Sequence, residues 1–249
     1  MEKINKLKIV FALSLACNLV FVFYAFHKTA WKVRQHSQQA AAVSPRIHRG
    51  AEPNTIRYAF GRDLVFRALP DDSNSIIFVG NSLTQLFELG ELFRNPHIKN
   101  RGIIGDNSRG VLLRLDEITK RRPSKVFLEI GINDLTRGYP VDSVNRNCRE
   151  IVRRIKKETP GSKIYLQSLL PANVPGADAV IPLENEIVNL NSSLRSLAQE
   201  EGCTFIDLYS SFTIEAGRLN PRYDCGDGLH LNGEGYLKWR DLVKRYVDE

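Results

Sequence analysis

Short apolar runs alternate along most of this chain with longer stretches in which apolar residues recur every three or four positions. Runs of the first kind are typical of buried strands, and the second pattern is typical of amphipathic helices. The expected strands are 76–79, 98–104, 126–130, 164–168 and 205–206. The expected helices are 83–93, 111–120, 144–158, 183–200 and 235–247. Five strand–helix units predict an α/β fold with a five-stranded parallel sheet, covered on both faces in three α/β/α layers.

Two of these elements show how the core is built. Residues 125–130 are almost continuously apolar, which favours a strand buried on both faces. In the helix expected over 183–200, one stripe of leucine and isoleucine recurs at spacings of three and four, so we expect it in the core. The stripe consists of Leu183, Ile187, Leu190, Leu194 and Leu197. Open parallel sheets bind ligands at the carboxyl ends of their strands, so functional residues are expected there.

The beginning of the chain has a different pattern. Residues 9–26 are an uncharged apolar run that follows three lysines, and we expect this run to form one membrane-spanning helix in an anchor of residues 1–27. A cleaved signal peptide is the alternative, although its apolar region is usually only ~7–15 residues long. A lipoprotein acylated at Cys17 is less favoured, because Ser14 stands where a branched apolar residue is expected.

Residues 28–55 are polar with no sustained apolar period, so we interpret them as a linker to one domain of residues 56–249. Three basic residues flank the apolar run on each side, and the charge rule for orientation therefore gives a tie. The short segment before the run favours an amino terminus in the cytoplasm. The catalytic domain would then be periplasmic or extracellular.

Charge separates the same two regions. The formal net charge is +7, and residues 1–50 carry all of it, with eight basic residues and one acidic residue. The remainder holds 27 residues of each sign, without the basic stripe that a nucleic-acid-binding protein presents. The Arg121–Arg122 pair is interpreted as solvated charge at a helix end. We therefore expect no nucleic-acid partner.

The four cysteines lack the spacing of a metal site. Cys17 lies in the apolar run, and Cys148 and Cys203 are interpreted as buried thiols. Whether Cys225 forms a disulfide is left open by the sequence.

Four short blocks carry the chemistry: Gly80–Leu83, Asn100–Asp106, Gly131–Asp134 and Asp227–His230. A serine hydroxyl becomes a useful nucleophile when a histidine takes its proton, a carboxylate holds that histidine, and hydrogen-bond donors face the developing oxyanion. Singly, a serine after a strand is usually a helix cap, and Asn or Gly after a strand is usually a turn residue. Together, in this order, the blocks favour a hydrolytic serine site.

The four blocks resemble the SGNH hydrolases, also called the GDSL family of esterases and lipases, over most of residues 75–247. The family has a flavodoxin-like fold. Residues 227–236, Asp-Gly-Leu-His-Leu-Asn-Gly-Glu-Gly-Tyr, carry the most specific likeness, whereas Asn81 replaces the common aspartate. Residues 100–106, followed by Arg109, are similar to the branch with intracellular platelet-activating-factor acetylhydrolases and many bacterial carbohydrate esterases.

The resemblance implies a role for each of five residues. Ser82 would be the nucleophile, His230 the general base, and Asp227 the carboxylate that orients it. The backbone N–H groups of Ser82 and Gly105, with the side-chain amide of Asn133, would form the oxyanion hole. No metal and no organic cofactor is required by this chemistry.

The expected function is hydrolysis of short-chain O-acyl esters, O-acetyl above all, on a carbohydrate or another polar carrier, so the expected partner is a small-molecule or glycan ester. Loops 171–182 and 210–226 are expected to shape the pocket, and neither has a long apolar stretch suited to an extended acyl chain. A lysophospholipase, a thioesterase or an acyltransferase could use the same serine. An inactive, membrane-anchored glycan-binding protein is the non-enzymatic alternative. The sequence leaves the oligomeric state open.

Overall fold

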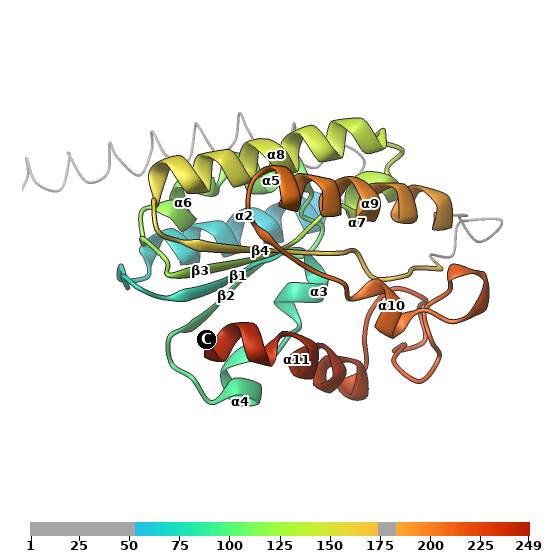
Figure 1. Cartoon of the computed structure of the whole chain (residues 1–249). Coiled ribbons are helices and arrows are strands. Elements are labelled where there is room, and N and C mark those ends of the chain that lie inside the picture. The colour runs from blue at the N-terminus through green and yellow to red at the C-terminus, as the bar shows by residue number, and fades with distance from the viewer. Residues whose placement is uncertain (1–52, 174–182) are drawn as a thin grey trace, which may run out of the picture. The chain divides into compact units, whose positions relative to one another are not determined.

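The computed structural model describes residues 53–173 and 183–249, and its centre is one parallel sheet (Figure 1). The strands are β1 (Ile76–Gly80), β2 (Ile98–Gly102), β3 (Lys125–Glu129), β4 (Lys163–Gln167) and β5 (Thr204–Ile206). They lie in the order β2-β1-β3-β4-β5, and every neighbouring pair is parallel. The predicted five-stranded parallel sheet is confirmed.

Helices pack on both faces of the sheet (Figure 1). One face carries α5 (Ser108–Leu113), α6 (Leu115–Thr119), α7 (Ile132–Thr136), α8 (Val141–Glu158) and α9 (Glu184–Glu200). The other carries α3 (Ser82–Gln85), α4 (Leu89–Phe93), α10 (Tyr209–Phe212) and α11 (Gly233–Asp248). A short 3₁₀ turn, η1 (Glu215–Gly217), follows α10. Alternate strand residues enter the two cores, with Val126 and Leu128 on the first face and Phe127 on the second.

The predicted leucine and isoleucine stripe of α9 is buried, as expected. Cys148 is buried as predicted, but Cys203 is partly exposed because it lies at the turn between α9 and β5. Cys225 is exposed, and these three cysteines of the described chain are free thiols.

The helix predicted over 83–93 is wrong as a single element, since α3 and α4 replace it. Asn100 on β2 explains the break: its side-chain Nδ2 lies 2.7 Å from the Thr84 carbonyl oxygen, 3.3 Å from that of Gln85 and 3.0 Å from that of Phe87. In a continuous helix these carbonyl oxygens would accept hydrogen bonds from backbone N–H groups of the next turn; here the Asn100 amide donates to them instead. Asn100 lies 13 to 16 residues after these carbonyls in the sequence, so local periodicity gives no sign of the contact.

A helix at the edge of the domain, α2 (Pro53–Ala68), was not predicted, and its start lies inside the expected linker. Arg121 helps to hold it. The interpretation of this arginine as solvated is wrong, because its guanidinium is buried, lies 2.7 Å from the Glu117 carboxylate and donates to the carbonyls of Phe66 and Pro70. A buried arginine becomes tolerable when a carboxylate and carbonyls satisfy it.

None of the helices in the described ranges is long and apolar enough to cross a membrane. The anchor expected over 1–27, with its apolar run 9–26, lies outside the described residues. The same holds for residues 28–52 of the expected linker and for most of the 171–182 loop.

Candidate active site

Ser82 stands at the turn from β1 into α3 and is only 8% exposed. Asn81 caps the helix, with its Oδ1 accepting the Leu83 N–H at 2.8 Å. Gly80 makes the turn possible, because a side chain there would come within 2.1 Å of the Thr84 hydroxyl oxygen and 2.5 Å of the Glu129 carbonyl oxygen. The local sequence therefore places the hydroxyl of Ser82 at the carboxyl end of β1.

Asp227 and His230 reach Ser82 from the loop before α11, and His230 lies 148 residues after Ser82 in the chain. The Nε2 atom of His230 lies 2.9 Å from the Ser82 Oγ, and its Nδ1 lies 2.6 Å from the Asp227 Oδ2. The other Asp227 oxygen accepts the backbone N–H groups of Leu229 at 2.9 Å and His230 at 2.8 Å. The three predicted residues thus form one continuous hydrogen-bonded chain.

The loop itself is fixed by neighbouring polar residues. The Asp224 carboxylate accepts the backbone N–H groups of Gly226 at 2.8 Å and Gly228 at 3.1 Å. Asn232 caps α11 by accepting the Gly235 N–H, and its Nδ2 donates to the Asp224 carbonyl. The histidine is therefore presented by a loop with internal support at both ends.

Asp227 keeps its negative charge over a wide pH range. Burial raises its pKa, but the backbone and side-chain hydrogen bonds from His230 and the backbone N–H of Leu229 outweigh that effect and hold the pKa at about 2. An ionised carboxylate at this position orients the imidazole and stabilises its protonated form.

Asn133 and Gly105 follow β3 and β2, at the same edge of the sheet as Ser82. The Asn133 Nδ2 donates to the Asp106 carbonyl at 2.8 Å, which fixes the amide and uses one of its two hydrogens. Gly105 adopts a φ of 74°, and its carbonyl accepts the Arg137 guanidinium at 2.9 Å. Neither the Ser82 nor the Gly105 N–H has an intramolecular acceptor in residues 53–173 and 183–249. These donors remain available to an oxyanion.

Arg114 joins the nucleophile strand to the Gly105 loop, and sequence reasoning missed it. Its Nε lies 2.8 Å from the Asp106 carboxylate, and its Nη2 lies 2.9 Å from the Arg101 carbonyl oxygen and 3.4 Å from that of Gly80. Both charged side chains are buried. Arg114 lies between α5 and α6, where the sequence predicted one helix over 111–120, and no local signal distinguished it from an exposed arginine.

Asp134 fixes the same loop to α7. Its carboxylate accepts the Ser108 backbone N–H at 2.9 Å and the Ser108 hydroxyl at 2.7 Å. Burial raises the pKa of Asp134 to about 6, although the Ser108 hydrogen bonds oppose that shift. The residue next to Asn133 is thus an anchor for the loop that carries Gly105.

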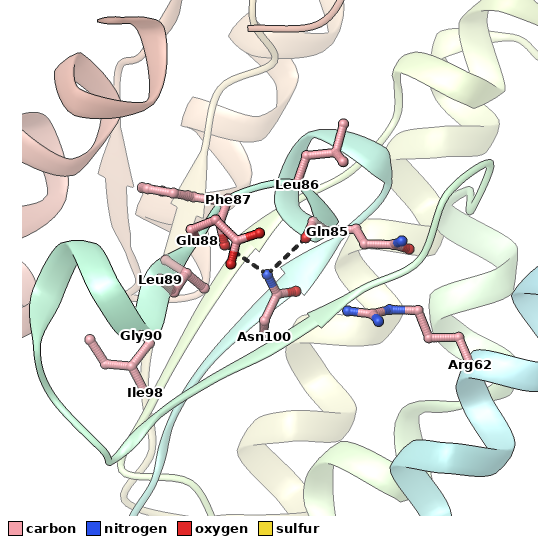
Figure 2. Close-up of a pocket in the computed structure, with 9 residues that line it drawn as sticks. All are labelled: Arg62, Gln85, Leu86, Phe87, Glu88, Leu89, Gly90, Ile98 and Asn100. Atoms are coloured by element: carbon pink, nitrogen blue, oxygen red, sulfur yellow. Dashed lines mark hydrogen bonds between the residues drawn. The ribbon is translucent and has the colours of Figure 1, made fainter. Parts of the chain in front are cut away.

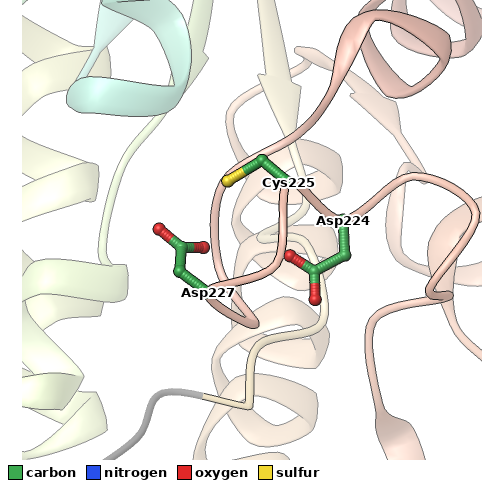
Figure 3. A group of neighbouring side chains, drawn as sticks. All are labelled: Asp224, Cys225 and Asp227. Atoms are coloured by element: carbon green, nitrogen blue, oxygen red, sulfur yellow. The ribbon is translucent and has the colours of Figure 1, made fainter.

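Asp224, Cys225 and Asp227 are neighbours whose potential ligand atoms all lie within 4.8 Å of one another (Figure 3). Each carboxylate already serves the loop, Asp224 through backbone N–H groups and Asp227 through His230. Partial desolvation and the nearby carboxylates of Asp227 and Asp224 raise the pKa of the Cys225 thiol, which disfavours the thiolate that binds metals. We assign no metal to this cluster.

A hollow of about 480 Å³ lies beside the nucleophile helix (Figure 2). Its lining comes from α2, α3, α4 and β2, and consists of Arg62, Gln85, Leu86, Phe87, Glu88, Leu89, Gly90, Ile98 and Asn100. None of the five predicted site residues lines it, so we do not assign it to the reaction.

Comparisons with known proteins identify the family of this chain. Residues 78–238 match the model of the GDSL-like Lipase/Acylhydrolase family. Platelet-activating factor acetylhydrolase IB subunit alpha2 from Homo sapiens is 30% identical over 190 residues, which cover 72% of this chain and 80% of that protein.

Solved structures share the fold. A GDSL-like lipase from Bacteroides thetaiotaomicron is 26% identical with a TM-score of 0.68, and the match covers 78% of this chain and 97% of that one. The acetyl xylan esterase AlAXEase has a TM-score of 0.59 at 20% identity, covers 70% of this chain and 99% of that one, and shows a similar fold. The chain therefore belongs to the GDSL-like lipase/acylhydrolase family and is a carboxylic ester hydrolase.

Proposed function

We propose that this enzyme removes short O-acyl groups, O-acetyl above all, from a carbohydrate or another polar carrier through an acyl-enzyme intermediate. The observation that carries the proposal is the chain of contacts from the Ser82 hydroxyl through His230 to Asp227, with distances of 2.9 Å and 2.6 Å. This is the arrangement that a serine nucleophile, a general base and an orienting carboxylate require.

In the first step, the Ser82 oxygen attacks the ester carbonyl carbon while its proton passes to the His230 Nε2. Asp227, ionised because its pKa is about 2, stabilises the resulting imidazolium through Nδ1. The carbonyl oxygen becomes an oxyanion, which the N–H groups of Ser82 and Gly105 and the second amide hydrogen of Asn133 would stabilise. Collapse of this intermediate breaks the ester C–O bond, and His230 returns the proton to the leaving alcohol.

In the second step, a water molecule attacks the acyl-Ser82 carbonyl carbon and His230 accepts one of its protons. The same donors stabilise the second oxyanion. Its collapse releases the carboxylic acid and returns the proton from His230 to the Ser82 oxygen, so the enzyme is regenerated. Every proton transfer in this sequence uses one imidazole, at a distance of 2.9 Å from the serine oxygen in the free enzyme.

Two observations support a short acyl group. The human relative described above is named an acetylhydrolase. In the 210–226 segment, the large apolar side chains Phe212 and Leu219 are buried in the core beside α11, so they do not line an open channel for a long acyl chain. Binding of an extended chain would need such apolar surface.

The test is a series of p-nitrophenyl esters from acetate to laurate, together with an acetylated xylooligosaccharide, assayed with the wild-type enzyme, Ser82→Ala and the exposed helix control Ser192→Ala. We expect kcat/KM to be highest for acetate, Ser82→Ala to be inactive, and Ser192→Ala to match the wild type. Preference for laurate would favour a lysophospholipase. Faster acyl transfer to an added alcohol than to water would favour an acyltransferase, and binding of the oligosaccharide without turnover would favour a glycan-binding protein.

We also propose that residues 9–26 anchor the enzyme in a membrane, with the hydrolase domain outside the cytoplasm. An 18-residue helix spans about 27 Å, close to the ~30 Å hydrocarbon core. The protein should resist carbonate extraction, and protease added to spheroplasts should digest the domain. Protection until lysis would place the domain in the cytoplasm, and a soluble form lacking the apolar run would indicate a cleaved signal.

A further inference from the structure

A fully buried glutamate lies beneath the nucleophile turn. Glu129 ends β3, is 0% exposed, and pairs in register with Gly80 of β1. Strand alternation puts its side chain on the same face as Phe127, which is the face that α3 and α11 cover. Its Oε2 lies 3.5 Å from the Asn81 Nδ2. Its Oε1 has no hydrogen-bond partner, and no ion pair involves Glu129 among the described residues.

The surroundings of this carboxyl group favour its neutral form. Burial raises the pKa of Glu129 to about 8. The titratable groups that sense it are Tyr236 from α11 and Cys148 from α8, and burial raises the pKa of both, so both are neutral near pH 7. Arg114, which reaches the Gly80 carbonyl, is paired with Asp106. The carboxyl group therefore lies in an uncharged polar setting.

Asn81 is the link between this carboxyl group and Ser82. Its amide oxygen accepts the Leu83 N–H at 2.8 Å, so its Nδ2 must face the other way, toward Glu129. An amide offers an acceptor on one side and donors on the other. Asparagine therefore suits a position between a helix N–H and a carboxyl oxygen, which gives a physical reason for asparagine where the family commonly has aspartate.

We propose that Glu129 is a positioning residue for the nucleophile: its carboxyl group holds the Asn81 amide, which in turn fixes the first turn of α3 and the Ser82 hydroxyl. The inference rests on the proposed serine mechanism. When Glu129 ionises, a negative charge develops under the turn and opposes the oxyanion that forms above it. The neutral form is thus the active one.

The first test measures the rate at which a fluorophosphonate probe labels Ser82 in the full-length protein, independently of the natural ester. We expect Glu129→Leu to slow labelling at least about tenfold and to lower kcat for p-nitrophenyl acetate with little change in KM, because the Asn81 amide loses its partner. The control is Val152→Ala, which leaves a cavity where a buried side chain of α8 packs. It should reduce stability but leave the labelling rate unchanged.

The route through Asn81 is tested by a double-mutant comparison. If Glu129 acts through Asn81, then Asn81→Ala/Glu129→Leu should label about as fast as Asn81→Ala alone. If the fold-reductions in labelling rate of the two single variants multiply in the double variant, the proposal is overturned. Labelling of Glu129→Leu at the wild-type rate would also overturn it.

Glu129→Gln provides a test that does not depend on a disruptive change. It keeps an acceptor and cannot ionise, so its kcat at pH 7 should stay within about twofold of the wild type. Wild-type kcat should fall above about pH 8, whereas that of the variant should not. The same alkaline fall in both proteins would overturn the proposal. A wild-type protein that the probe does not label would instead contradict the serine mechanism itself.

Discussion

Removal of the Arg114 guanidinium, by Arg114→Leu, is the most informative test of how the site is held together. This side chain joins three backbone segments, because it donates to the Asp106 carboxylate and to the carbonyls of Arg101 and Gly80. Arg114 is 5% exposed and Asp106 is 2% exposed, so water does not compensate for the loss. Without Arg114, the Asp106 carboxylate still accepts a hydrogen bond from the Asn107 N–H but loses its ion pair.

The expected cost is large. Breaking a buried ion pair by removing one partner typically costs about 3–5 kcal/mol, because the remaining charge is left uncompensated. Two carbonyls also lose donors, which adds about 1–2 kcal/mol. We therefore expect Arg114→Leu to lower the free energy of unfolding by at least about 3 kcal/mol. Adding Asp106→Asn removes the unpaired charge and should recover about 2 kcal/mol of this loss.

The assay is urea unfolding, followed by the fluorescence of Trp239, which is fully buried, and by far-UV circular dichroism. Arg109→Leu is the matched control, because Arg109 is an exposed residue of α5, the helix that ends just before Arg114, and its loss should change stability by less than about 0.5 kcal/mol. A loss below about 1 kcal/mol for Arg114→Leu, or a double variant less stable than the single one, would refute the account.

Four further changes test other parts of the site. Asn133→Ala should lower kcat by ~10²–10³ with little change in KM, as steady-state kinetics will show; an unchanged kcat would remove Asn133 from the oxyanion hole. Asp227→Asn should lower kcat at least about 100-fold with an unchanged circular dichroism spectrum, and full activity would contradict its orienting role. Burial raises the pKa of Glu129 to about 8 from about 4.3 in the unfolded chain, so its contribution to stability is present at low pH and is lost between about pH 4 and 8. From pH 5 to pH 8, the urea midpoint of the wild type should therefore fall relative to that of Glu129→Gln. If the difference between the two midpoints is the same at both pH values, Glu129 is not buried as a neutral acid. Dialysis against EDTA should leave ester hydrolysis unchanged; loss of activity that a divalent metal restores would contradict the metal-free mechanism.

The sheet and the serine, histidine and aspartate contacts could be predicted because their signals are local. Apolar runs mark the strands, and each of the four blocks lies at the carboxyl end of a strand or shortly before a helix. In a parallel sheet the carboxyl ends of strands meet at one edge, which explains why Ser82, Gly105 and Asn133 lie together. The resemblance to the SGNH hydrolases, rather than this topology, predicted that His230 would meet Ser82. Their observed contact, at 2.9 Å, agrees with that prediction.

The features that sequence reasoning missed depend on contacts between distant residues. The Asn100 amide ends α3 from the neighbouring strand, and Arg121 is buried because carbonyls of a distant segment accept its hydrogens. Glu129 lies near the end of a run that favours a buried strand. The neighbouring sequence does not show whether the carboxyl group at that position is buried or exposed. Periodicity reports which face of an element is apolar, but not which polar partner reaches it.

The most direct test of the serine mechanism is reaction of the full-length protein with a fluorophosphonate probe, followed by peptide mass mapping. A probe of this kind forms a covalent bond to a serine whose proton a neighbouring base accepts. We expect one modified residue, Ser82, with labelling lost in Ser82→Ala and strongly reduced in His230→Ala, while both variants remain folded. Modification of a different serine, or full ester hydrolysis by Ser82→Ala, would contradict it.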